Sequence, residues 1–391
     1  LSDAPSGESS IGTRWLIPVL VRTVADARAE GTGSDGVARV LLTEERAPLP
    51  PGPGDGPVLL NAGGWGVYRV GYPPEHRARL AERLQALTSL ERFDLLSDTW
   101  ALVLAGRAEL GELFELAARL GDEEEEAVET YHVVVSSLHL CARVADAVDR
   151  PAVVAAAQTL LRPRADALGW DARAGEGERV PTLRALLLEA LGTTGETKEV
   201  LTETARRFGA WRQGGVAIDA NLESAVLAVV ADQNREGDYE AVLDRYRHPA
   251  NPQEERRHLL ALGCFADLDL CGRTFELAIG EVRSQDGPVV VRSLLANRVG
   301  GSMIWERVKA EWSRILDRFP DVSHAAMVSA VRTLCHDPAL ADDVTQFLAD
   351  HPLPVGQRTV AQTLERLAVN VRFGERLRGK VAGELAKTVA R

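Results

Sequence analysis

Histidine, cysteine and acidic side chains are the residues of this chain that could bind a metal or take part in catalysis. A zinc peptidase needs the spacing His-Glu-x-x-His, which puts two imidazoles on one helix face and a carboxylate beside the metal-bound water. None of the eight histidines is followed by Glu. His132 and His139 could share a helix face two turns apart, but we favour a pair of partly buried, hydrogen-bonded histidines over a shared metal.

Other catalytic signatures are also missing from the sequence. It has no Gly-x-Ser-x-Gly elbow, no Walker-type phosphate loop and no Gly-x-Gly-x-x-Gly turn after a strand. We interpret the acidic run 122–126 as the solvated first turn of a helix, favoured by the helix dipole, rather than as a cation site. The sequence therefore predicts no catalytic residue, no metal ligand and no cofactor in this chain.

The four cysteines lie far apart in apolar stretches, and none has the spacing of a zinc-ligand pair: Cys141, Cys264, Cys271 and Cys335. We interpret them as the reduced, buried thiols of a cytoplasmic protein. Cys264 and Cys271 could form a disulfide only if the fold brings their Cα atoms together.

Charge and hydropathy exclude two classes of partner. The formal net charge of -12 would repel a phosphate backbone, so we expect no nucleic-acid partner. No apolar run approaches the roughly 20 residues that a spanning helix needs, so we expect no membrane partner.

The elements that would position these residues begin with β structure. Four segments rich in β-branched residues predict short strands separated by Gly- and Pro-rich loops: residues 14–22, 38–43, 57–61 and 66–70. Pro18 favours a sheet edge or a bulge for the first strand, because proline cannot donate a ladder hydrogen bond. Four short strands bury little apolar surface, so we expect a small, incomplete β-sandwich over residues 1–72.

Helical periodicity follows over residues 73–391. Thr88 and Glu91 have the spacing of a capping box, and Asn251 precedes a helix that opens with proline. An apolar stripe at helical spacing runs through residues 304–319. Short breaks separate many medium-length helices without a fixed repeat. We therefore expect a mostly α chain whose second domain, residues 73–391, is an irregular αα-superhelix of the HEAT or armadillo type.

The segment Asn61-Ala-Gly-Gly-Trp-Gly-Val-Tyr68-Arg69-Val-Gly-Tyr72 resembles a junction in the aminopeptidase N family of zinc aminopeptidases. There, an Asn, a Gly-aromatic turn and a Tyr-Arg-Val-x-Tyr strand end a small β-sandwich that follows the catalytic domain. Further stretches agree in family order: residues 15–19, 90–98, 284–312 and 362–370. The resemblance covers nearly the whole chain and is closest to the puromycin-sensitive and endoplasmic-reticulum aminopeptidases.

This resemblance implies a non-catalytic C-terminal region whose catalytic residues and zinc lie in a preceding part of the polypeptide. We accordingly expect the natural chain to begin upstream of Leu1. In the family, the helical domain closes over the zinc cleft to form a chamber that admits peptides, and its opening gates their entry. The implied partners are the catalytic domain of the same polypeptide and peptide substrates.

Arg298 and Asn297 are the candidate chamber residues, because they match a region that faces the chamber in relatives. The Arg298 guanidinium could bind a peptide carboxylate as a bidentate donor. The alternative is an arginine at a helix end or paired with a surface acid. Asn297 is expected to shape the turn.

Five further residues are expected to hold the junction between the sheet and the helices: Asn61, Tyr68, Arg69, Tyr72 and Asp98. We expect Tyr68 to bury its ring and hydrogen-bond its hydroxyl, and Arg69 to pair with Asp98.

Two other classes of function remain open from the residues. A free-standing helical scaffold could bind a protein or peptide partner in its groove, and an upstream His-Glu-x-x-His would exclude it. An unrecognised enzyme has no residue in its favour.

Overall fold

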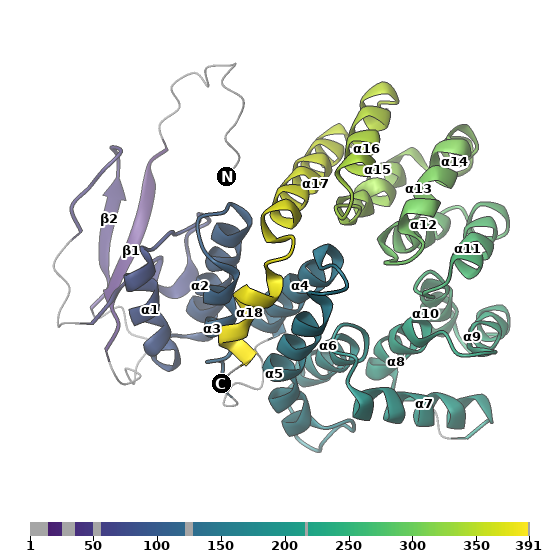
Figure 1. Ribbon diagram of the computed structural model, residues 1–391, viewed down its shortest axis with the longest axis horizontal. Coiled ribbons are helices and arrows are strands. Elements are labelled where there is room, and N and C mark those ends of the chain that lie inside the picture. The colour runs from purple at the N-terminus through teal and green to yellow at the C-terminus, as the bar shows by residue number, and fades with distance from the viewer. Residues whose placement is uncertain (1–14, 26–35, 50–55, 122–127, 216–217, 390–391) are drawn as a thin grey trace. The chain divides into compact units, whose positions relative to one another are not determined.

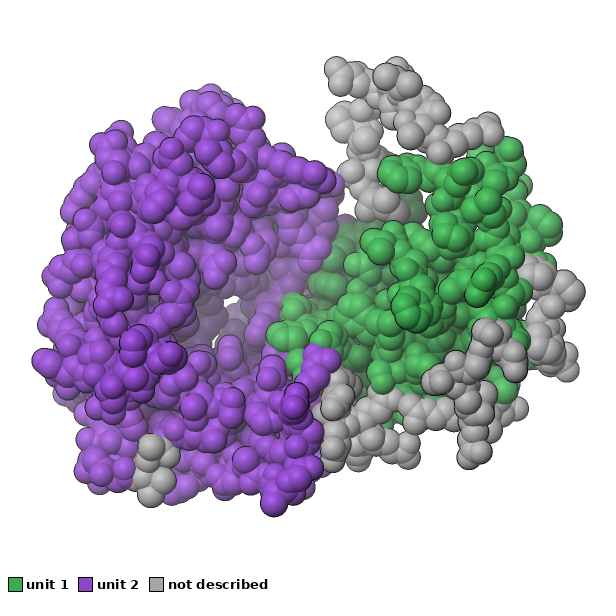
Figure 2. Space-filling model, turned by 180° about the vertical axis from the view of Figure 1, so that it is seen from behind, with its two compact units in different colours: residues 1–137, 384–391 green, residues 138–383 purple. Residues whose placement is uncertain are grey.

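The computed structural model describes residues 15–25, 36–49, 56–121, 128–215 and 218–389 (Figure 1). The acidic run 122–126 lies outside the described residues. Contacts divide the chain into two compact units, unit 1 with residues 1–137 and 384–391, and unit 2 with residues 138–383 (Figure 2). The expected domain boundary between residues 72 and 73 stays a prediction.

A three-stranded antiparallel sheet lies in unit 1, with strand order β2-β1-β3. Its strands are β1 (Ile17–Thr23), β2 (Ala38–Leu42) and β3 (Val58–Leu60). The strand that contains Pro18 is therefore central in this order, but Pro18 itself lies at a local edge, one of the two places predicted for it. Pro18 faces Leu41 of β2, whereas β3 pairs only with residues 21–23. The proline is tolerated because it has a strand neighbour on one side alone.

The fourth predicted strand, residues 66–70, is also wrong, because this segment joins no ladder. The Val70 amide donates to Oδ2 of Asp98 (3.0 Å), and the Gly66 amide donates to Oδ1 of Asn61 (2.6 Å). Side chains thus accept the hydrogen bonds from these two amides that a neighbouring strand would otherwise accept. The described part of the expected sandwich is one thin sheet.

Three of the described helices lie wholly within unit 1. They are α1 (Pro74–Glu82), α2 (Ser89–Leu104) and α3 (Leu110–Ala117), with the short 3-10 turns η1 (Ala62–Gly64) and η2 (Leu84–Ala86). Thr88 and Glu91 form the predicted capping box at the start of α2. Two further helices, α4 (Val128–Val144) and α18 (Val381–Val389), contribute residues to both units.

Unit 2 consists of helices. They are α5 (Arg150–Leu168), α6 (Val180–Thr193), α7 (Lys198–Arg212), α8 (Ala220–Gln233), α9 (Asp238–Arg247), α10 (Pro252–Leu262), α11 (Leu268–Gly280), α12 (Gly287–Ala296), α13 (Gly301–Ala310), α14 (Trp312–Arg318), α15 (Asp321–Val328), η3 (Ser329–Thr333), α16 (Pro338–Asp350) and α17 (Gln357–Leu377). None of the described helices is long and apolar enough to cross a membrane.

These helices alternate between two layers (Figure 1). In the inner layer α6, α8, α10, α12 and η3 pack successively on one another, and α5, α7, α9 and α11 pack against them from outside. This arrangement is that of an αα-superhelix, so the prediction of a mostly α chain with a small sheet is confirmed. Asn251 caps α10 as predicted, since its Oδ1 accepts the Glu254 amide (2.9 Å). The stripe over residues 304–319 is buried but spans two helices, α13 and α14.

Hydrogen bonds join parts of unit 2 that are distant in sequence. The Arg143 guanidinium, at the end of α4, donates to the carbonyl oxygen of Ala296, at the end of α12. The buried carboxylate of Asp149, before α5, accepts from the amides of Val381 (3.3 Å) and Ala382 (3.0 Å). Asp149 therefore caps the first turn of α18, the last helix of the chain.

Two helical glycines give a matched test of this inner packing. A Cβ on Gly192 of α6 would lie 2.4 Å from Cγ2 of Val229 on α8, whereas a Cβ on Gly209 of α7 would meet nothing within 4 Å. We expect Gly192→Ala to lower the free energy of unfolding by about 1–3 kcal/mol through overpacking. Gly209→Ala should raise it by about 0.5–1 kcal/mol, because alanine is the better helix former. Urea unfolding measures both, and equal effects would contradict the close approach of α6 and α8.

Candidate functional site

Three carboxylates on one face of α2 organise the predicted junction. Glu91, Asp94 and Asp98 are three and four residues apart, so they project from the same side of the helix. Glu91 and Asp98 are only 3% and 6% exposed. Buried carboxylates need partners, and all three receive them from the sheet or from residues 61–70.

Asn61 holds the turn that follows β3. Its backbone is left-handed, with φ of 58°, a conformation that asparagine tolerates better than most residues. Its Nδ2 donates to the Gly66 carbonyl (3.1 Å) and to Oδ2 of Asp94 (3.0 Å), while its Oδ1 accepts the Gly66 amide. One side chain thereby closes the turn and fastens it to α2.

Glu91 ties β1 to the start of α2. It forms an ion pair with Arg22 (2.6 Å) and accepts the amides of Gly63 (3.0 Å) and Thr88 (2.9 Å). Burial alone would raise the pKa of Glu91, but the hydrogen bonds from Arg22, Thr88 and Gly63 outweigh it, and the pKa is lowered. The carboxylate therefore stays charged in its pocket.

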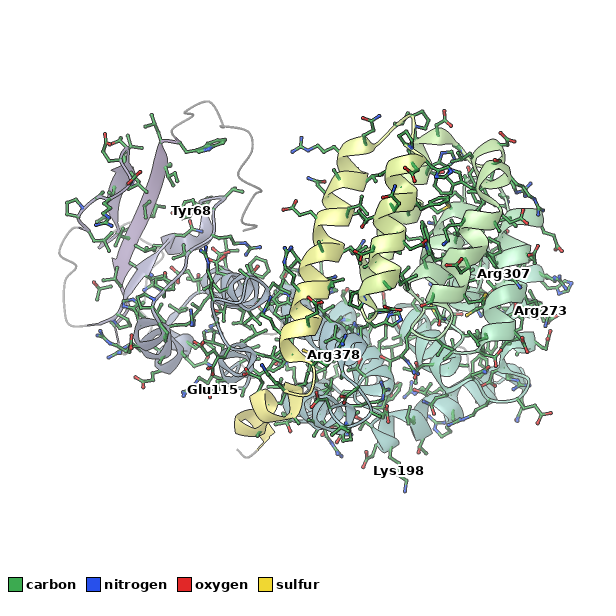
Figure 3. The ribbon with its side chains drawn as sticks, turned by 45° about the horizontal axis from the view of Figure 1, so that its top comes forward. Tyr68, Glu115, Lys198, Arg273, Arg307 and Arg378 are labelled. Atoms are coloured by element: carbon green, nitrogen blue, oxygen red, sulfur yellow. The ribbon has the colours of Figure 1, made fainter. Side chains whose placement is uncertain are left out.

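Two further contacts involve the remaining junction residues: an ion pair between Arg69 and Asp98, and a hydrogen bond to the hydroxyl of Tyr72. Nη1 of Arg69 lies 3.0 Å from Oδ1 of Asp98, as expected, and burial raises the pKa of Asp98 despite this partner. The hydroxyl of Tyr72 accepts the Leu60 amide (2.8 Å), and burial raises the tyrosine pKa far above its usual range. Tyr68 (Figure 3) is half-buried, and the expected hydrogen bond of its hydroxyl stays a prediction. The role of the five residues as a junction stays a prediction.

Substitutions of Asn61 separate its hydrogen bonds from its backbone preference. Asn61→Gly should cost about 1–3 kcal/mol of unfolding free energy, because it leaves the Gly66 backbone groups and Asp94 without their partner. Asn61→Ala should cost about 1–2 kcal/mol more, because alanine disfavours the left-handed backbone. Denaturant unfolding measures both; equal losses for Gly and Ala would show that the backbone angle is unimportant.

A concave hollow of about 730 Å³ lies within unit 2. Its wall is built by the inner helices α6, α8, α10 and α12 and by η3, and the space-filling view shows unit 2 hollowed on the side turned to the viewer (Figure 2). Side chains from five segments distant in sequence therefore share one space. Its volume is in the range of small-molecule and peptide sites.

Arginines dominate the charge of this hollow. Arg256 pairs with Asp286 (2.6 Å) and Arg257 with Glu223, whereas Arg292 makes no ion pair within the described parts of the chain. Arg332 donates to the Ser329 carbonyl (2.7 Å), a neutral acceptor. Glu189 is the one acidic residue among those that line the hollow. The wall is thus positive in a chain whose formal net charge is -12.

Glu189 is itself poorly solvated. Burial raises its pKa to about 7, and no arginine compensates for that effect. At neutral pH the residue is therefore partly protonated, which adds to the positive character of the hollow.

Cys264 also lines the hollow, so the expectation that all four cysteines are buried is wrong for this residue. Its Sγ lies 3.7 Å from the Leu260 carbonyl oxygen and 3.7 Å from Oγ of Ser293. Desolvation of its Sγ atom raises the pKa of the thiol, although the residue as a whole is exposed. Cys264 and Cys271 are both free, so they form no disulfide.

The two candidate chamber residues lie at the end of α12. Asn297 is buried and fully bonded to the backbone: its Nδ2 donates to the carbonyls of Gly263 (3.1 Å) and Phe265 (2.9 Å), and its Oδ1 accepts the Gly300 amide (3.0 Å). Arg298 is exposed and pairs with Asp232 (2.9 Å). Substrate contact by either residue stays a prediction.

His132 and His139 differ in environment. His132 is exposed and His139 is half-buried. Burial and the charge of Arg143 lower the pKa of His139 to about 4, which keeps its ring neutral. The described helices contain no His-Glu-x-x-His motif. The resemblance implies catalytic zinc ligands only for a preceding part of the polypeptide, and the described residues do not form that ligand set.

The residues of the hollow were not found from the sequence. Glu189, Arg292 and Arg332 come from α6, α12 and η3, and nothing in their local spacing marks them. The adjacent pair Arg256-Arg257 follows two glutamates in the sequence, so its charge did not mark a basic inner face.

A pH series tests the environment of Glu189. Because its folded pKa lies above the ordinary glutamate value of 4.5, the folded state binds the proton more tightly, and stability falls as pH rises from about 4.5 through 7. Glu189→Gln removes this loss, so we expect its Tm to exceed that of the parent at pH 8 and to match it near pH 4.5. A constant difference across the series would contradict the raised pKa.

Fold and site together define a helical-repeat domain that follows a small sheet and encloses a basic hollow. The chain belongs to the family described as "ERAP1-like C-terminal domain", whose pattern matches residues 57–369. It is 28% identical to aminopeptidase M1-A of Oryza sativa subsp. japonica over 98% of the chain and 44% of that relative. It is 31% identical to aminopeptidase M1-C of the same plant over 85% of the chain and 38% of the relative.

A more distant relative has a similar span. The puromycin-sensitive aminopeptidase of Caenorhabditis elegans is 22% identical over 94% of the chain and 40% of the relative. The chain thus spans less than half the length of these relatives. The resemblance to the C-terminal part of such aminopeptidases is confirmed.

Proposed function

We propose that this chain is the C-terminal region of a zinc-dependent aminopeptidase that removes N-terminal residues from peptides. Its catalytic residues and zinc would lie in a preceding part of the same polypeptide, which is its first partner. Support comes from the family of C-terminal domains to which the chain belongs and from relatives named as aminopeptidases. The relatives are more than twice as long as the stretch they share with this chain, which leaves room for that part.

The hollow of unit 2 would form part of the chamber that holds the peptide. The observation that carries this proposal is the charge of its wall, where Arg292 and Arg332 have no acidic partner among the described residues. A peptide whose N-terminus is being cleaved has a free carboxylate at its other end, and a guanidinium binds a carboxylate with two parallel hydrogen bonds. Arg298, beside this wall, would assist if it released Asp232.

The same inner layer would gate access. The helices that line the hollow also pack on one another in series, so a small rotation at each interface would widen or narrow the space without unfolding a helix. Reduced thiols at the four cysteines support the cytoplasm as the compartment.

Substrate kinetics of the full-length enzyme test the carboxylate contact. We expect the double substitution Arg292→Ala with Arg332→Ala to raise KM for a peptide of about ten residues with a free carboxylate by about 10- to 100-fold, the loss of one charge-assisted contact. KM for the C-terminally amidated peptide and for a single-residue anilide should change little.

Arg273→Ala is the matched control, because Arg273 lies on the outer helix α11 and pairs with Glu240 (Figure 3). It should leave all three substrates unaffected. Equal effects of the double substitution on the free acid and the amide would overturn the proposed role of the hollow.

A further inference from the structure

Three buried side chains of unit 2 bring their ligand atoms together. They are Glu223 on α8 and Glu254 and His258 on α10, and one ligand atom of each lies within 4.8 Å of the others. Their exposed fractions are 7%, 8% and 0%. Glu254 and His258 are four residues apart, so they share one face of α10, and that face is turned to α8.

His258 has an unused nitrogen that points into this cluster. Its Nδ1 lies 3.0 Å from the carbonyl oxygen of Glu254, so a neutral ring with hydrogen on Nδ1 donates there and leaves a lone pair on Nε2. Nε2 is buried without a hydrogen-bond partner and lies 3.8 Å from Oε1 of Glu223. A buried polar atom without a partner is costly, and an electron-pair acceptor at this point would remove that cost.

Neighbouring groups hold the imidazole of His258 in one orientation. The indole of Trp211 stacks on the ring, with centroids 5.4 Å apart, and restricts its rotation. A hydrogen bond from the other ring nitrogen to a carbonyl is the usual way in which a metal-binding histidine is oriented.

Each carboxylate is held in place by an outer partner. Arg257 bonds Oε2 of Glu223 and leaves Oε1 unused. Arg245 lies 2.7 Å from Oε1 of Glu254, whose Oε2 accepts the Ala250 amide. Both guanidiniums reach solvent, with side chains 39% and 20% exposed, so water screens their repulsion of a cation. The two carboxylates and the two guanidiniums cancel in charge, so a bound divalent ion would leave this cluster with a net charge of two, which the nearby water screens.

We propose that Glu223, Glu254 and His258 bind one divalent transition-metal ion, with water completing its coordination. One imidazole nitrogen and two carboxylate oxygens form a ligand set that Zn²⁺ and Co²⁺ accept, whereas Mg²⁺ and Ca²⁺ prefer oxygen alone. The ion links α8 to α10, two neighbouring helices of the inner layer, and therefore fixes the part of the wall that carries Arg256 and Arg257.

Calorimetric titration of the 391-residue chain with Zn²⁺, after removal of metal with EDTA, tests this site. We expect one ion per chain, and a loss of affinity of at least about tenfold in His258→Gln and in Glu223→Gln. Bound Co²⁺ should show ligand-field absorption without the charge-transfer band of a thiolate, which separates this site from one built on the free cysteines. Circular dichroism of each variant verifies its fold.

His324→Gln is the matched control, since His324 is equally buried and its ring nitrogens have no hydrogen-bond partner. Within the described parts of the chain it has one carboxylate nearby, that of Asp321 at 4.0 Å, and joins no group of three ligands. The variant should bind Zn²⁺ as the parent does. The proposal is overturned if the folded parent chain binds no Zn²⁺, or if folded His258→Gln and Glu223→Gln bind it as tightly as the parent. Should one of these two variants fail to fold, the other decides the question.

Discussion

The need to give the three carboxylates of α2 partners, two of them buried and that of Asp94 half-buried, is the constraint on which unit 1 depends. A buried charge without a partner would cost several kcal/mol, more than most single contacts supply. Glu91 requires Arg22 of β1, Asp94 requires Asn61 after β3, and Asp98 requires the backbone at Val70. The sheet is thin, but its position on the helix is set at three separate points, so it does not rely on apolar burial alone.

Unit 2 depends on a different constraint: its helices must pack in series while they curve around the hollow. Alternation between two layers brings one helix of each pair to the inside, and polar residues on that face then meet across the hollow. Arginines are suited to this position, because their long stems pack on helices while their charged ends reach water. Arg257 combines two contacts, because it lines the hollow and also bonds Glu223 of the neighbouring helix α8.

Features that depend on neighbours in sequence could be predicted. The capping box at Thr88 and the cap at Asn251 follow from side chains within one helical turn, and both are present. The segment at 66–70 has the composition of a strand, but Asn61 and Asp98 bond its backbone instead, and that competition is tertiary.

The sites were harder to find for the same reason. A motif search tests spacing on one helix, whereas Glu223 reaches His258 from a neighbouring helix. Cys264 lies in an apolar stretch, which predicts burial. It instead follows α10 and lines the hollow, and that position depends on the tertiary arrangement of the helices. Arg292 and Arg332 likewise become neighbours of one cavity only after the array curves.

The hydrogen bonds of Arg143 and Asp149 have a consequence for how unit 2 unfolds. An open array of helical repeats has only nearest-neighbour interfaces, so it can lose repeats from one end while the rest stays folded. Here the start of the array is bonded to the end of α12 and to the first turn of α18. Fraying of either end therefore breaks contacts at a distant repeat. Such long-range connections favour cooperative unfolding of the array over the loss of single repeats from one end.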